Sequence, residues 1–255
     1  MLFRSNRKLH GILRVCDLSA DVLHCTRDLN IPVVGLHTSG PHDDPLTVSI
    51  DWRELVRLGV ESLAKQGCKS MGLITPFGFW RTPHSPRVLR RGAWDDDIKS
   101  FQNTLVQLGI PYDPSLIWEY HPSPNEIAGI SEYITNEERG YHAFKALFTQ
   151  AQPQRPEGLL ILDDTMTKGA ISAAQSLNIK MGTDVRIATH SNLGAPALRS
   201  HRNRLTLLEV SVQDMVELMF QMLEQAWNGA APAPHATLIK PSCSSSSICS
   251  QGATE

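Results

Sequence analysis

The chain has 255 residues, of which 41% are hydrophobic, and its formal net charge is −2. This length and composition suit a large α/β domain or two smaller lobes, and the near-neutral charge gives no general attraction to nucleic acid. The five cysteines are scattered without metal-binding spacing, so we expect free thiols, no metal site and no cofactor. No signal peptide is evident and no apolar run approaches the ~20 residues of a membrane helix, which predicts a soluble, cytoplasmic protein.

Apolar runs of strand length alternate with segments of helical periodicity along most of the chain. Strands are predicted, in chain order, over residues 11–15, 31–36, 71–74, 116–120, 159–162, 185–188 and 205–210. Helices are predicted over residues 20–29, 51–66, 88–108, 125–150, 166–177 and 212–227. This alternation predicts an α/β fold with parallel sheets and right-handed crossovers.

The most informative stretch runs from residue 156 to residue 190. An apolar strand over 159–162 ends in two carboxylates, Asp163 and Asp164, and a helix and a second apolar strand follow. Ligands of open α/β sheets bind beyond the carboxyl ends of parallel strands, so this turn is a candidate ligand contact. No nucleophile elbow, P-loop or metal-ligand helix pair occurs, and adjacent carboxylates cannot straddle a glycosidic bond. We therefore expect a binding protein and not an enzyme.

Several segments, in order, resemble the effector-binding core of the LacI/GalR family of sugar-responsive transcriptional regulators. Among them are Ile31-Pro-Val-Val, Arg90-Arg-Gly-Ala-Trp and Leu205-Thr-Leu-Leu-Glu-Val. The other matching segments are residues 9–13, 48–60, 63–74, 158–174 and 184–188. Each segment is a weak pattern, but their order and spacing over roughly residues 8–240 make the joint resemblance fairly specific.

The resemblance implies a two-lobed, type I periplasmic-binding-protein-like fold that binds a small-molecule effector, a sugar or sugar derivative, between its lobes. The first lobe would hold residues 1–78 and 211–232, the second would hold 79–210 and 233–241, and the Ser-rich 242–255 would be a disordered tail. The first two βα units of the family and its DNA-binding headpiece have no counterpart, so the first lobe is expected to be incomplete. The full-length protein would be a homodimer, and operator DNA would need the missing headpiece.

An incomplete first lobe has a physical consequence for the strand predicted over residues 11–15. In the family's strand order, the missing first strand would lie beside it. We therefore expect an exposed apolar edge and a poorly soluble or oligomerising chain.

The resemblance also assigns candidate ligand-binding residues. Arg90 would reach sugar hydroxyls with its fork of donors, although the family glycine sits one place early and leaves Arg91, or a surface role, open. Asp163 is favoured as a ligand contact and Asp164 as the cap of the following helix. Ser191 and Asn192 stand where the family has a sugar-binding aspartate. Aromatic candidates for stacking on the sugar are Phe79, Trp80 and Tyr120.

Two alternatives to a regulator stay open at this point. A sugar-binding protein of a transport system would share the fold, and a truncated remnant without binding activity would explain the missing carboxylate at Ser191. The sequence upstream of Met1 would separate these possibilities.

Overall fold

A computed structural model describes the chain in separate stretches. They are residues 10–15, 20–37, 46–76, 80–82, 85–89, 91–118, 134–149, 155–229 and 236–244. The chain divides into two compact units, Met1–Asp51 with Ser211–Lys240 and Trp52–Val210 with Pro241–Glu255. Each unit is described by itself.

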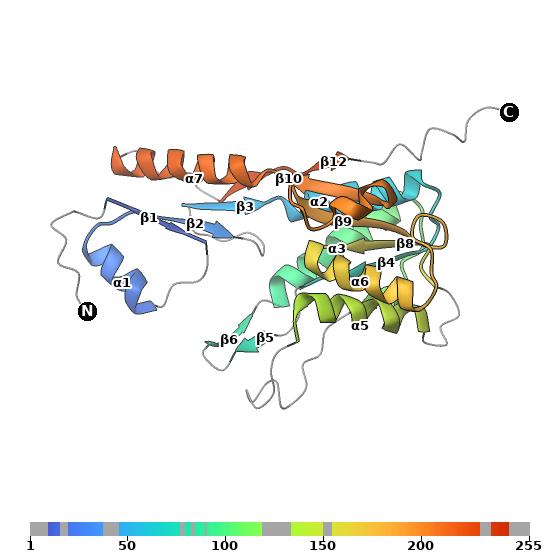
Figure 1. The fold of residues 1–255 in the computed structure, drawn as a ribbon. Helices are drawn as coiled ribbons and strands as arrows, with labels where there is room; N and C mark the ends of the chain where they lie inside the picture. The colour runs from blue at the N-terminus through green and yellow to red at the C-terminus, as the bar shows by residue number, and fades with distance from the viewer. Residues whose placement is uncertain are drawn as a thin grey trace. The chain divides into compact units, whose positions relative to one another are not determined.

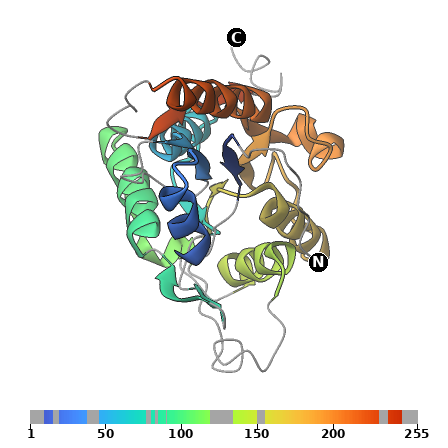
Figure 2. The same cartoon turned by 90° about the vertical axis from the view of Figure 1, so that its left-hand side faces the viewer.

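The first unit is built on a parallel sheet with the strand order β1-β2-β3-β11. These strands are β1 (Ile12–Arg14), β2 (Val33–His37), β3 (Thr47–Ile50) and β11 (Thr237–Ile239). Helix α7 (Val212–Trp227) packs along one side of the sheet through Met215, Met219 and Met222, and α1 (Ala20–Asp28) lies on the other side (Figure 1 and Figure 2). Among the described strands, β1 stands at one end of this order.

The second unit has a six-stranded sheet in the order β12-β10-β9-β8-β4-β7. All its neighbouring strands are parallel except β12 and β10. The strands are β4 (Met71–Ile74), β7 (Ile117–Trp118), β8 (Gly158–Ile161), β9 (Arg186–Asn192), β10 (Leu205–Val210) and β12 (Ser242–Ser244). The α/β class with parallel sheets is therefore confirmed.

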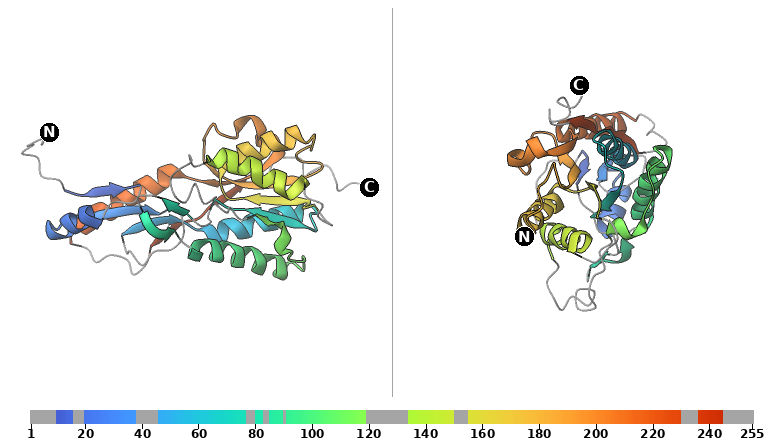
Figure 3. Two further views of the ribbon diagram at one scale, coloured as in Figure 1. Left: turned by 90° about the horizontal axis from the view of Figure 1, so that it is seen from below. Right: turned by 90° about the vertical axis from the view of Figure 1, so that its right-hand side faces the viewer.

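Helices cover both faces of this sheet. Figure 3 shows α5 (Asn136–Thr149) and α6 (Asp164–Ser176) on one face, with α2 (Trp52–Lys65) and α3 (Arg91–Gln107) on the other. Strands β4 and β8 are buried along their whole length, as expected for apolar strands with helices on both faces. The smaller elements are a hairpin of β5 (Trp80–Thr82) and β6 (Ser85–Leu89), and the 3-10 turns η1 (Pro114–Leu116) and η2 (Arg199–Arg204).

Two glycines bring α5 and α6 into close contact. A methyl group at Gly140 would overlap the backbone carbonyl of Met166, and one at Gly169 would overlap the carbonyl of Glu137. Each glycine therefore lies against the backbone of the opposite helix. The sequence predicts a helix over 125–150, of which the structure describes the part from Asn136 onwards.

The structure corrects the predicted division of the chain. The sequence places the first border at residue 78, but α2 packs against β8, β9 and β10, and β4 pairs with β7 and β8. The border therefore falls between Asp51 and Trp52. The sequence assigns residues 233–241 to the second lobe, but β11, which lies within this segment, pairs with β3 of the first sheet.

Other corrections concern short elements. Residues 242–244, predicted to be disordered, form β12 by pairing with β10, while 245–255 lie outside the described residues. No strand is predicted between residues 74 and 88, where the structure has β5 and the start of β6, and the predicted helix over 88–108 begins only at Arg91. Strand β3 has no counterpart among the predicted strands. Polar and apolar residues alternate along it, so it lacks the continuous apolar run of the other buried strands, yet all four of its residues are buried.

Candidate functional site

Polar side chains gather at the carboxyl ends of β8 and β9 in the second unit. These strands are neighbours, and their register pairs Ile161 with Thr189. Continuing this register places Asp163 level with Ser191. The structure thus brings together three of the predicted ligand-binding residues, Asp163, Ser191 and Asn192, at the edge where open α/β sheets bind ligands.

Asp163 caps helix α6. Its Oδ1 accepts a hydrogen bond from the Met166 backbone N–H at 2.7 Å, and its Oδ2 accepts one from Asn136 Nδ2 at 3.2 Å. Burial raises the pKa of the Asp163 carboxyl, and the hydrogen bond from Met166 opposes this rise. The sequence assigns the cap to Asp164, which is wrong because α6 already includes Asp164 as its first residue. A carboxylate has further lone pairs, so capping leaves Asp163 able to accept from a ligand.

Alternation along β9 directs its side chains to the two faces of the sheet. Thr189 and Thr167 of α6 have their hydroxyl oxygens 2.6 Å apart, so Thr189 faces α6. Period-two alternation gives Ser191 the same side as Thr189, and it gives His190 and Asn192 the opposite side. Ser191 is only 2% exposed, and its hydroxyl donates to the Asn192 carbonyl at 3.4 Å, whereas Asn192 is half-buried.

His190 packs against Trp52, the first residue of α2. The two ring centroids are 5.5 Å apart at an interplanar angle of 50°. Burial lowers the pKa of His190, and the nearby Asp164 carboxylate opposes this effect. Within the described part of the chain, His190 Nε2 is buried without a hydrogen-bond partner. This aromatic pair is missing from the predicted site, although the alternation of β9 could have revealed the direction of His190.

A buried carboxyl group lies beside the end of the neighbouring strand β4. Asp97 of α3 is 5% exposed and hydrogen-bonds with Thr75, which directly follows β4. Burial, with a smaller contribution from the negative charge of Asp96, raises the pKa of Asp97 to about 8, although the hydrogen bond with Thr75 opposes this rise. A run of three acidic residues such as Asp95, Asp96 and Asp97 is typical of a solvated helix face, but Asp97 is buried.

The predicted site includes four further residues. Arg90, Phe79 and Tyr120 lie outside the described residues. Trp80 begins β5, and the structure describes only its backbone.

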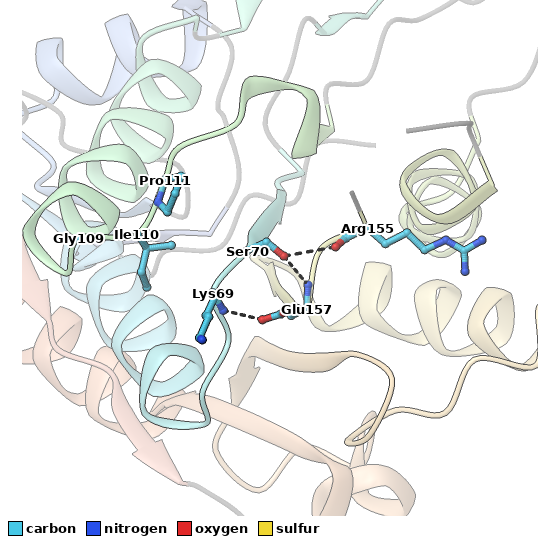
Figure 4. A pocket seen from close by; sticks show the side chains of 7 residues that line it. All are labelled: Lys69, Ser70, Gly109, Ile110, Pro111, Arg155 and Glu157. Carbon is cyan, nitrogen blue, oxygen red and sulfur yellow. Dashed lines mark hydrogen bonds between the residues drawn. The ribbon is translucent and has the colours of Figure 1, made fainter. Parts of the chain in front are cut away.

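A hollow with a volume of about 630 Å³ lies at the opposite, amino end of the sheet. Its lining residues include Lys69, Ser70, Ile110, Arg155 and Glu157. The Glu157 carboxylate accepts from the Lys69 backbone N–H at 2.6 Å, and the Ser70 hydroxyl donates to the Arg155 carbonyl at 3.3 Å (Figure 4). Figure 4 shows the Arg155 guanidinium directed away from the other lining residues. These bonds join the segments that precede β4 and β8, which is a structural role.

The described ranges contain neither a metal-binding cluster nor a membrane-spanning helix. No group of three or more histidine, cysteine or acidic side chains there could hold a metal ion. None of the helices in those ranges is long and apolar enough to span a bilayer.

Comparison with known proteins identifies the family. The periplasmic binding protein-like domain matches residues 60–244, which is most of the chain. The chain belongs to this family. A related protein is catabolite control protein A of Staphylococcus epidermidis, which is 23% identical over 175 residues, or 69% of this chain and 45% of that protein. The aligned part of the chain thus spans less than half of this relative's length.

Solved structures of transcription regulators share the fold. The transcription regulator CcpA of Lactococcus lactis matches with a TM-score of 0.68 and 17% identity, over 92% of this chain and 76% of that one. The transcriptional regulator CelR in complex with cellobiose matches with a TM-score of 0.67 and 16% identity, over 92% of this chain and 64% of that one. A sugar-binding transcriptional regulator of the LacI family from Escherichia coli, complexed with phosphate, matches with a TM-score of 0.62 and 16% identity, over 91% of this chain and 74% of that one.

Proposed function

We propose that this chain is the ligand-sensing core of a LacI/GalR-type transcriptional regulator and that its effector is a sugar or sugar derivative. The observation that carries the proposal is the polar edge at β8 and β9, in a chain of the periplasmic binding protein-like family. The relatives support the regulator over a transport protein, because catabolite control protein A, CcpA and CelR are regulators by name.

The proposed binding site is centred on Asp163, Ser191 and Asn192. Asp163 would accept hydrogen bonds from sugar hydroxyls, and Asn192 offers both a donor and an acceptor. Arg90, Phe79, Trp80 and Tyr120 complete the proposal, with Arg90 as a hydroxyl-binding fork and the aromatic rings as stacking surfaces.

His190 and Trp52 are proposed as the apolar wall beside these polar groups. Sugar sites combine a few oriented polar groups with aromatic surface, which excludes water from the hydrogen bonds. The Nε2 atom of His190 adds one buried polar group to this wall. Ser191 stands where the resemblance to the family implies a sugar-binding aspartate. A neutral hydroxyl forms weaker hydrogen bonds than a carboxylate, so we expect vicinal hydroxyls of the sugar to be bound less tightly than by a second carboxylate.

Isothermal titration calorimetry with a panel of sugars tests the proposal. The panel contains ribose, glucose, galactose, cellobiose and glucose 6-phosphate. At least one should release or absorb heat with a 1:1 stoichiometry, and Asn192→Ala should weaken this binding about tenfold or more, which corresponds to about 1.4 kcal/mol. Val106→Ala, an exposed substitution on α3, is the matched control and should bind as the parent does. Heat from none of the five sugars would contradict a sugar effector.

A further inference from the structure

Strand β10 carries a buried acidic residue at its carboxyl end. Glu209 is only 6% exposed, and its Oε2 accepts a hydrogen bond from the Arg202 guanidinium at 3.0 Å. Arg202 belongs to the 3-10 turn η2, and its side chain is 50% exposed. Burying a charge costs free energy unless the charge is paired, so this ion pair allows a glutamate to lie within the sheet. Neither residue is among the predicted ligand-binding residues.

The pairing of β10 with β9 fixes the face of the sheet on which Glu209 lies. Glu209 pairs with Ser191, and paired residues of parallel strands point to the same face. Leu207, two residues before Glu209, belongs to the apolar cluster formed with α5 and α6. Leu208 points to the other face, where its side chain would meet a methyl group placed at Gly59 of α2. Glu209 therefore points to the α6 side of the sheet, as Ser191 does.

Three polar residues thus form one row across neighbouring strands at their carboxyl ends. This polar row consists of Asp163, Ser191 and Glu209. The preceding row on the same face is apolar apart from one threonine, and its members are Ile161, Thr189 and Leu207. Neighbouring strands lie about 4.8 Å apart, so about 10 Å separates the backbones of the two acidic residues, with the neutral serine between them.

We propose that Glu209 is a further specificity-determining residue of the effector site, and that Glu209 and Asp163 accept hydrogen bonds from one ligand lying over Ser191. This inference rests on the proposed function, because it adds a contact to the same site. A carboxylate offers about four lone-pair sites, so Glu209 can keep its bond to Arg202 and also accept from a ligand hydroxyl. The ligand class that fits carries hydroxyl groups on opposite sides, as a sugar ring does.

The ion pair gives the effector site donors as well as acceptors. A guanidinium has five N–H donors, and the bond from Arg202 to Glu209 uses one of them. The exposed side chain of Arg202 can therefore donate to a ring or hydroxyl oxygen of the same ligand. A solely structural role would be different, because Glu209 would then only anchor η2 and would not distinguish one ligand hydroxyl from another.

Calorimetric titration of Glu209→Gln with the five panel sugars tests the proposal. Glutamine keeps the length of the side chain but accepts weaker hydrogen bonds, so the Kd of the sugar that binds the parent chain should rise about tenfold. Glu224→Gln, the same exchange at an exposed position of α7 in the other unit, is the matched control and should bind as the parent does. Circular dichroism checks that each variant is folded.

The monodeoxy derivatives of that sugar separate a ligand contact from a structural role. In the parent chain, removing the hydroxyl that Glu209 accepts should raise the Kd about tenfold, whereas in Glu209→Gln the same removal should cost less than about twofold. Arg202→Gln breaks the ion pair but keeps the Glu209 carboxylate, so the dependence on this hydroxyl should persist there. Glu209→Asp withdraws the carboxylate by one methylene group and should lose the dependence, which gives a second variant if Glu209→Gln does not fold.

The possible results distinguish this inference from the proposed function. Heat from the parent chain with none of the five sugars would contradict the proposed function and this inference with it. A sugar that binds the parent chain and Glu209→Gln with Kd values within about twofold would overturn the inference alone. Equal weakening of the sugar and all its monodeoxy derivatives by Glu209→Gln would also overturn it, because Glu209 would then only hold η2 in place.

Discussion

Asn136 of α5 donates a hydrogen bond to the Asp163 carboxylate at 3.2 Å, and this bond ties the cap of α6 to the neighbouring helix. The same carboxylate accepts the backbone N–H of Met166. The side chain at the centre of the proposed binding site therefore also holds the start of α6 in place.

Asp163→Asn and Asp163→Ala should separate the capping role from the charge. Asparagine is as good an N-cap as aspartate, so Asp163→Asn should keep most of the stability, whereas Asp163→Ala should lower the free energy of unfolding by about 1–2 kcal/mol. Urea unfolding followed by circular dichroism measures the difference. Equal stability of the alanine variant and the parent chain would contradict the cap.

Replacing either glycine of the α5–α6 contact should destabilise the second unit. Gly169→Ala would force a methyl group against the Glu137 carbonyl, so we expect a loss of about 1–3 kcal/mol even though alanine favours a helix by about 1 kcal/mol. Ser172→Ala, at an exposed position of the same helix, is the control and should change the stability little. An unchanged or raised melting temperature for Gly169→Ala would show that the helices lie further apart.

The buried Asp97 should make the fold less stable as the pH rises. Its pKa is about 8 in the folded chain and near 3.8 when unfolded, so between these values the folded state holds a proton that the unfolded state has lost. Stability should fall across this range by up to about 1.4 kcal/mol per pH unit. Asp97→Asn should reduce this slope and should be more stable than the parent chain at pH 8. Parallel stability curves for the two proteins would contradict a protonated Asp97.

The buried His190 should make the fold less stable as the pH falls into the acidic range, which is the opposite of the effect of Asp97. Burial lowers its pKa below the usual 6.5, so the unfolded chain takes up a proton before the folded chain does. The contribution of His190 to the free energy of unfolding should therefore be fully present above pH 6.5 and be lost as the pH falls below this value. His190→Phe should flatten this part of the curve, whereas His142→Asn, at an exposed position of α5, should not. A curve left unchanged by His190→Phe would place His190 in contact with solvent.

The sequence predicts the long elements well because their signals are local. Apolar runs such as 159–162 and 205–210 are buried strands, and the heptad-like spacing of methionines in α7 marks its buried face. The short strand β12 escapes prediction, because a Ser-Cys-Ser segment has no apolar pattern and is placed by backbone pairing with β10.

The site is only partly predictable for similar reasons. The run 163–165 contains two carboxylates that could each cap a helix, and a shift of one residue in the helix start decides between them. Asp97 sits within a run of three aspartates, and its burial depends on the packing of α3 against the sheet, which the chain's local pattern does not contain. The border at Asp51 is missed because α2 follows β3 in sequence but packs on the other sheet.

The central claim is that an effector binds at the carboxyl ends of β8 and β9. Its most direct test is an amide NMR titration of the isotope-labelled chain with each of the five panel sugars. We predict that a binding sugar shifts the amides of residues 163–165 and 190–192 most strongly. Shifts confined to the hollow around Lys69 and Glu157, or unchanged spectra with all five sugars, would contradict the claim.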